Sequence, residues 1–196
     1  RLARRTSPDA VTEAGSATME RRTSKSPRLK GFRFRVVPGD NAATRLAALD
    51  EVFYEEPVDG IVHVVSYGHA TPRRAGGTSG AAPSRTRDEQ LAAELEDWTI
   101  TAHRIAAMAV RRAKPMWVVI AVTKADLYPN DIDAAVDYYS PGSSSPFAAK
   151  LDELRSLAGG ATISIDVLPV SAENSKELDA LVGKLESRMA ALSGHL

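Results

Sequence analysis

The 196-residue chain contains no cysteine and no long apolar run, and its charges balance. Without cysteine it can form neither disulfides nor thiolate metal sites, and it offers no position for palmitoylation or prenylation. No apolar run approaches the ~18 residues that a transmembrane helix needs, so we expect no membrane anchor in this chain. Lys plus Arg number 25, as do Asp plus Glu. This balance argues against nucleic acid as a partner.

The remaining composition is that of an ordinary globular protein. Hydrophobic residues make up 43% of the chain and charged residues 26%, which is typical of a folded domain. This length is ample for one α/β domain and short for two. The basic residues at Arg1–Arg5 are not followed by an apolar segment. No signal peptide is therefore visible, and we expect a cytoplasmic protein.

Two apolar segments rich in β-branched residues end directly in polar loops. Met116–Val122 is followed by Thr-Lys-Ala-Asp at 123–126, and Ile163–Val170 is followed by Ser-Ala-Glu at 171–173. Buried parallel strands deliver polar side chains in this way to the carboxyl edge of an open α/β sheet, where ligands bind. The sequence therefore predicts that both loops contribute to one binding site.

Together these loops carry the groups that recognise a guanine base. The Asp126 carboxylate can accept from N1–H and from the exocyclic N2 amine, and the Lys124 stem can lie along the base plane. The backbone of Ser171–Ala172 can donate to O6. Adenine presents the opposite pattern at this edge, so the site would reject it by leaving buried polar groups unpaired.

The other periodic segments alternate between strand and helix patterns. Strands are predicted at Leu29–Val37 and Val58–Tyr67, and helices at Asn41–Glu56, Asp88–Arg112, Ser145–Ala158 and Ser175–Ser193. This order predicts an α/β fold with a doubly wound, mostly parallel sheet and helices on both faces. Residues 1–26 and 131–142 are predicted to be mainly loops. Residues 68–87, rich in Gly, Ala, Ser, Pro and Arg, are predicted to be a flexible insertion.

These motifs and this order of elements resemble the G domain of Ras-like small GTPases. Thr123–Asp126 is similar to the family's Asn/Thr-Lys-x-Asp motif, and Ser171–Glu173 to its Ser-Ala-x motif. The resemblance covers nearly the whole chain and implies a single partial G domain over residues 1–196. It implies a switch protein that binds GTP and GDP with Mg²⁺ and that works with effector or regulator proteins. The implied base-binding residues are Thr123, Lys124, Asp126, Ser171 and Ala172.

The motifs that bind phosphate and Mg²⁺ in this family are matched less completely. Gly39 matches the glycine of the family's Asp-x-x-Gly motif, whose amide approaches the γ-phosphate, but the aspartate of that motif is Val36 here. Because that aspartate holds a Mg²⁺-bound water, its absence weakens the metal site. Thr18 is placed to be the switch I threonine that senses Mg²⁺, and Thr12 is nearly as well placed.

Asp40 stands where the family carries the glutamine that orients the attacking water. Its carboxylate could position that water, although the added negative charge opposes the transition state unless a cation compensates. Alternatively, Asp40 simply caps the helix that begins near Asn41. The resemblance therefore implies hydrolysis that is slow or partner-assisted.

No Gly-x-x-x-x-Gly-Lys-Ser/Thr motif occurs in the sequence, so the family's phosphate loop has no match. Because Arg1–Arg5 reads like the end of the helix that follows that loop, we expect a sequence truncated at its N-terminus. Three alternatives stay open. The chain could be a non-hydrolysing pseudo-GTPase that serves as a protein-interaction scaffold, or a nucleotide kinase. It could also be an α/β domain whose strand-end polar residues only cap helices.

Overall fold

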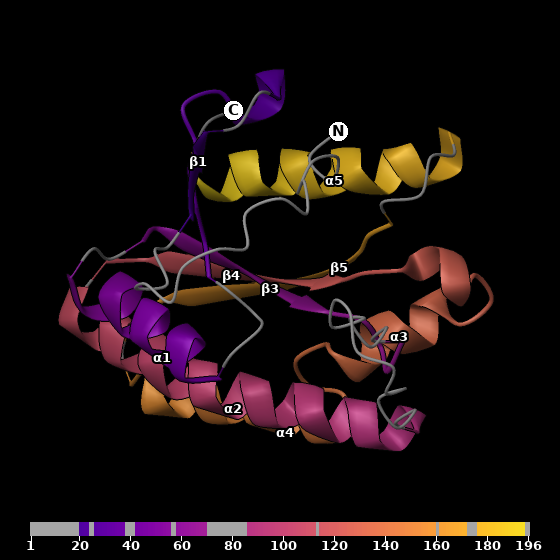
Figure 1. Ribbon diagram of the computed structural model, residues 1–196, viewed down its shortest axis with the longest axis horizontal. Coiled ribbons are helices and arrows are strands. Elements are labelled where there is room, and N and C mark those ends of the chain that lie inside the picture. The colour runs from indigo at the N-terminus through magenta and orange to yellow at the C-terminus, as the bar shows by residue number, and fades with distance from the viewer. Residues whose placement is uncertain are drawn as a thin grey trace, which may run out of the picture. The chain divides into compact units, whose positions relative to one another are not determined.

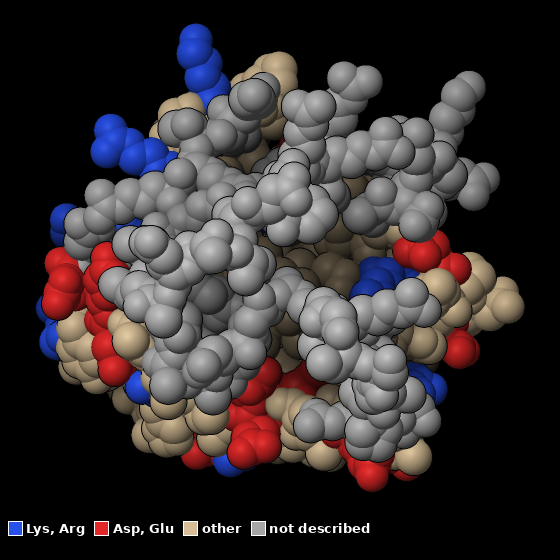
Figure 2. All heavy atoms as spheres, in the orientation of Figure 1, with Lys and Arg blue, Asp and Glu red and all other residues tan. Residues whose placement is uncertain are grey.

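The computed structural model describes residues 20–23, 26–37, 42–55, 58–69, 86–112, 114–159, 161–171 and 176–194. By its contacts the chain divides into two compact units. The larger unit lies within Asp59–Leu185, and the remaining described residues group into the smaller one. Acidic and basic side chains are interspersed on the described surface of the face shown in Figure 2.

The larger unit is built on a three-stranded parallel sheet in the order β3-β4-β5 (Figure 1). The central strand is buried at every position, which explains its continuous apolar sequence, because helices and neighbouring strands cover a central parallel strand on all sides. In the register, Gly60 lies opposite Trp117 and Met116 opposite Ile163. The three strands are β3 (Gly60–Val65), β4 (Met116–Val122) and β5 (Ile163–Pro169).

Helices α2 (Arg87–Arg112) and α4 (Pro146–Leu157) lie side by side on one face of this sheet (Figure 1). The Trp98 side chain of α2 is fully buried, with its ring 4.9 Å from the His63 ring of β3 and 5.5 Å from the Phe147 ring of α4. The core of the unit therefore lies between the sheet and these helices. Its other large, fully buried members include Ile105, Met108, Leu151 and Leu154.

Two further helices belong wholly or partly to the larger unit. Helix α3 (Ile132–Tyr138) contacts β5 and α4. The first part of α5 (Lys176–Leu192) lies across the sheet from α2 and α4 (Figure 1). The prediction of an irregular loop over 131–142 was wrong for residues 132–138, which form α3. A helix of only seven residues shows little periodicity, and it depends on tertiary packing such as the burial of Ala135.

The smaller unit contains an antiparallel pair of strands, β1 (Glu20–Thr23) and β2 (Arg33–Val36), in which Glu20 lies opposite Val36. This pair forms a sheet separate from the parallel one. Strand β2 falls within the predicted strand at 29–37. Strand β1 was not predicted, because its sequence Glu-Arg-Arg-Thr has no apolar alternation.

A helical segment follows β2 in the smaller unit. Helix α1 (Ala42–Asp50) continues as a π-helical turn over Glu51–Glu55, and Val52 and Phe53 are buried there. The predicted helix over 41–56 is thus divided between two kinds of helix. The α/β class and the parallel sheet are confirmed, whereas a complete doubly wound sheet stays a prediction.

Gly60 is needed where β3 passes the Trp117 side chain. A Cβ added at Gly60 would lie 1.9 Å from Cε2 of Trp117. Trp117 is buried, so its ring would have to shift within a packed core. We expect Gly60→Ala to lower the free energy of unfolding by about 1–3 kcal/mol, as overpacking does. Denaturant titration measures this. Val64→Ala on the same strand is the control, because Val64 is 62% exposed; equal midpoints for the two variants would contradict the packing argument.

Candidate functional site

Three loops at the carboxyl edge of the parallel sheet are tied together by hydrogen bonds. The amide and hydroxyl of Thr123, after β4, both donate to the Val65 carbonyl of β3, at 2.8 and 2.7 Å. On the other side, the Ala125 amide donates to the Val170 carbonyl at 3.2 Å, and the Val170 amide donates to the Val122 carbonyl at 2.8 Å. The loop after β4 is therefore anchored to both of its neighbours.

Asp126 and Ser171 meet across two of these loops. The Ser171 hydroxyl donates to Oδ1 of Asp126 at 2.5 Å. Ser171 is only 1% exposed, and Asp126 is half-buried. A hydrogen bond from a neutral hydroxyl orients a carboxylate without neutralising it. Asp126 is thus an acceptor whose orientation is fixed.

Lys124 lies between these anchors in a left-handed backbone conformation, with φ 62° and ψ 33°. Its ammonium donates to the His69 carbonyl in the loop after β3. A non-glycine residue at positive φ is uncommon, and such strain is found mainly where surrounding contacts enforce it. The hydrogen bonds of Thr123 and Ala125 on either side supply that enforcement.

Tyr128 supports the same loop through its hydroxyl and its ring. Its hydroxyl donates to the Thr123 carbonyl at 2.6 Å, and its ring stacks on the His69 ring with centroids 5.1 Å apart at 21°. The Tyr128 side chain is 4% exposed. The residues Thr123–Asp126 are therefore supported by a buried aromatic group as well as by the sheet.

The loop after β3 is held by Glu94 of α2, a residue that the sequence interpretation missed. Its carboxylate accepts from the Ser66 amide at 3.0 Å, the Ser66 hydroxyl at 2.9 Å and the Gly68 amide at 3.4 Å. It also accepts from the Tyr139 hydroxyl. A signal for this role exists in the sequence. Glu94 lies three and four residues from Leu91 and Trp98, on the apolar stripe of the helix, where an acid needs partners.

The three tyrosines around this loop have raised pKa values. Burial, together with the charges of Glu94 and Asp126, raises the pKa of Tyr128 from its ordinary 10.0 to about 12. Burial and the Glu94 carboxylate also raise the pKa of Tyr139 and of Tyr138. All three side chains therefore hold their protons more tightly in the folded state than in the unfolded state.

Because of these raised pKa values, the stability of the folded protein varies with pH in the alkaline range. Because the folded pKa values lie above the unfolded value of 10.0, stability is fully present below pH 10 and falls as pH rises toward about 12. We expect denaturant midpoints to fall between pH 10 and 11.5. Tyr139→Phe should be less stable than the parent at pH 8 but should lose less on going to pH 11.5. A parallel loss in both proteins would contradict this assignment.

The structure brings four of the predicted site residues to one edge of the sheet: Thr123, Lys124, Asp126 and Ser171. Ala172, Gly39, Asp40 and Thr18 lie outside the described residues, as does most of the predicted insertion over 68–87. Of that insertion, Gly68 and His69 at one end and Thr86 and Arg87 at the other are described.

The described residues provide little for a metal ion. No group of three or more His, Asp or Glu side chains among them could hold one. The candidate Mg²⁺ residue Thr18 is not among them, so the predicted metal site stays a prediction. Within the same residues, no helix combines the length and the apolar character needed to cross a membrane.

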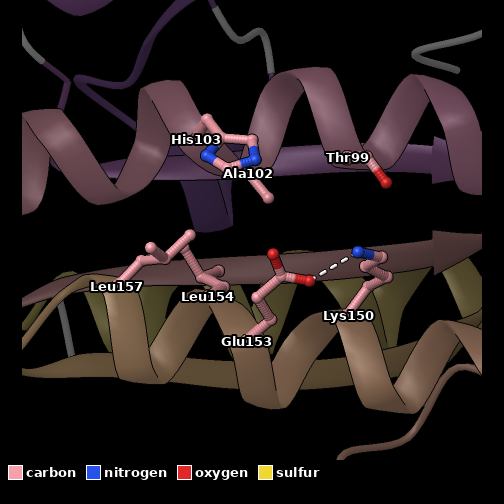
Figure 3. A pocket seen from close by; sticks show the side chains of 7 residues that line it. All are labelled: Thr99, Ala102, His103, Lys150, Glu153, Leu154 and Leu157. Carbon is pink, nitrogen blue, oxygen red and sulfur yellow. Dashed lines mark hydrogen bonds and ion pairs between the residues drawn. The ribbon is translucent and has the colours of Figure 1, made fainter.

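Apart from the sheet edge, a hollow lies between α2 and α4 (Figure 3). Its two charged residues satisfy each other, because Lys150 Nζ lies 2.6 Å from Oε2 of Glu153. That hydrogen bond holds the pKa of the Glu153 carboxyl below its usual range. The hollow therefore lacks a charged group directed at a ligand. Its other lining residues are Thr99, Ala102, His103, Leu154 and Leu157.

Comparison of the chain with protein-family models, with curated proteins and with solved structures finds no match in any of the three.

Proposed function

We propose that this chain carries the base-binding part of a guanine-nucleotide switch protein of the Ras-like class. The observation that carries the proposal is the hydrogen bond between Ser171 and Asp126. These residues belong to two motifs 45 positions apart, each assigned to base recognition from the sequence alone. A buried donor that orients one carboxylate oxygen leaves the group ready to accept from a base.

The chemistry of these side chains fits guanine. The Asp126 carboxylate is an acceptor, which suits the N1–H and N2 amine donors of guanine and opposes the N1 acceptor of adenine. The Lys124 stem, tied at its end to the His69 carbonyl, offers a flat apolar surface for the base. Each hydrogen bond to a charged group contributes about 1.5–3 kcal/mol, or roughly 10- to 150-fold in affinity.

The division of the strands into two sheets also supports the proposal. Strand β3 pairs only with β4 among the described strands, and β2 pairs only with β1. In the Ras-like sheet one more strand lies between the strands that β2 and β3 resemble. Two separate sheets are what that layout implies where this central strand is not among the described residues.

Binding of the nucleotide's phosphates and of Mg²⁺ would also require a phosphate loop, which has no match in this sequence. Bound Mg²⁺ would offset phosphate charge, and this chain's candidates near it are Thr18, Gly39 and Asp40. With Val36 in place of the motif aspartate, we propose that GTP hydrolysis is slow or depends on a partner. Val36 at the position of the motif aspartate also fits a second candidate function, a non-hydrolysing pseudo-GTPase that binds proteins as a scaffold.

The test is a comparison of GMP and AMP binding to the 196-residue chain by NMR titration. We expect GMP to bind at least about tenfold more tightly, because adenine would leave Asp126 unpaired. Ser171→Ala should weaken GMP binding several-fold, whereas Ser164→Ala, at an exposed position on β5, should not. Equal binding of the two nucleotides would overturn the guanine proposal. No binding of either would favour the scaffold.

A further inference from the structure

We infer that Glu94 is a positioning residue for guanine recognition, acting through the turn Ser66–His69 on the side chain of Lys124. The inference rests on the proposed function, since it concerns how the same site is held. Glu94 lies on α2 and is not one of the residues proposed to touch the base. Its influence would pass through two hydrogen-bonded connections, each made by described residues.

The first connection joins Glu94 to the turn. One oxygen, Oε1, accepts from the Ser66 amide, the Ser66 hydroxyl and the Gly68 amide. The other, Oε2, accepts from the Tyr139 hydroxyl. A partly buried carboxylate is costly unless such donors surround it, so this arrangement fixes the group and the turn together.

The turn needs this support because its backbone is unusual. Tyr67 has φ 51° and Gly68 has φ 72°, so two consecutive residues are left-handed. For Tyr67 this conformation is unfavourable, because its Cβ lies too close to the following carbonyl oxygen. The Arg87 guanidinium lies 4.1 Å from the centre of the Tyr67 ring, and Arg87 Nε donates to the Tyr67 carbonyl at 3.4 Å. Two residues of α2 thus hold the turn: Arg87 through an exposed contact and Glu94 through part-buried hydrogen bonds.

The second connection joins the turn to the base loop. The His69 carbonyl accepts from the Lys124 ammonium, which fixes the far end of the lysine stem. The His69 ring stacks on Tyr128, whose hydroxyl holds the Thr123 carbonyl. If the turn moved, both the end of Lys124 and the support beneath Thr123 would move with it. Preorganisation of this kind raises affinity by lowering the ordering cost of binding.

A carboxylate suits this task better than an amide. Glutamine would offer a single acceptor oxygen, so it could not accept both from the turn and from the Tyr139 hydroxyl, as the two carboxylate oxygens do. We expect Glu94→Gln to raise the Kd for GMP about three- to tenfold, equivalent to weakening about one hydrogen bond. In the ligand-free protein, the amide resonances of His69 and Lys124 should shift as well.

The test is a double-mutant cycle of Glu94→Gln and Lys124→Met, with the Kd for GMP measured by NMR titration. Methionine keeps an apolar stem but cannot donate to the His69 carbonyl. If Glu94 acts mainly through Lys124, Glu94→Gln raises the Kd clearly less in the Lys124→Met background than in the parent, and any remaining rise reports the path through His69 and Tyr128. A merely structural role would lower the melting temperature in both backgrounds and raise the Kd equally in both.

Three results would overturn the inference: an equal effect in both backgrounds, no effect on the Kd in the parent, or unshifted His69 and Lys124 resonances. If Glu94→Gln does not fold, Ser66→Ala replaces it, because it removes only the hydroxyl contact with Glu94. The same pattern with a smaller effect is then expected. Failure of the proposed function appears differently, as a parent protein that binds GMP no better than AMP, and it would end the inference too.

Discussion

Asp126→Asn is expected to lose its preference for guanine and to gain one for xanthine. Xanthine carries a C2 carbonyl where guanine carries the N2 amine, and an asparagine amide can donate to that carbonyl, which a carboxylate cannot. The variant should bind GMP roughly 10- to 150-fold more weakly, because a hydrogen bond to a charged acceptor is lost. NMR titrations of the parent and the variant with GMP and with XMP measure this change in base preference.

The exchange of specificity separates a binding role from a structural one. Replacing a residue that only stabilised the loop would weaken the binding of both nucleotides. Asp133→Asn, at an exposed position on α3, is the matched control and should leave both affinities unchanged. The base-site assignment would be wrong if Asp126→Asn bound GMP as tightly as the parent, or bound XMP no better than GMP.

Trp98→Ala is expected to destabilise the protein by about 3–5 kcal/mol, the usual cost of emptying a large aromatic site in a core. Trp98 is 0% exposed and packs between His63 of β3 and Phe147 of α4. Its removal would leave a cavity where the sheet, α2 and α4 meet. The free energy of unfolding from denaturant titration gives the size of the effect.

Trp98→Phe tests the same site with less loss of volume. The indole Nε1 of Trp98 is buried and has no hydrogen-bond partner in the described part of the chain. Phenylalanine removes that unpaired donor, which offsets part of the lost packing. We therefore expect Trp98→Phe to cost clearly less than Trp98→Ala. Val110→Ala, on the same helix but 56% exposed, should cost little; a similar cost for all three variants would contradict the packing account.

The long elements of the larger unit were predictable because their patterns are strong. The strand at Met116–Val122 has the predicted bounds, and the predicted helix at 88–112 begins one residue earlier, at Arg87. An uninterrupted apolar run and a 26-residue amphipathic stripe leave few alternatives. Strand β1 and helix α3 have neither signal, and they exist because of the partners against which they pair or pack.

The candidate site was predictable to a similar, limited extent. That Asp126 and Ser171 meet follows from the rule that parallel strands deliver their following loops to one edge. The connection from Lys124 to the His69 carbonyl does not, because it joins residues 55 positions apart through a backbone atom that carries no sequence signal. Glu94 could have been suspected as an acid on an apolar stripe, but its partners could not have been named.

The most direct test of the account is a map of backbone amide shifts in the 196-residue chain on addition of GMP and of AMP. We expect GMP to shift the amide resonances around Lys124, Asp126 and Ser171, and AMP at the same concentration to shift them far less. Equal shifts with both nucleotides, or shifts confined to residues away from this edge of the sheet, would contradict it.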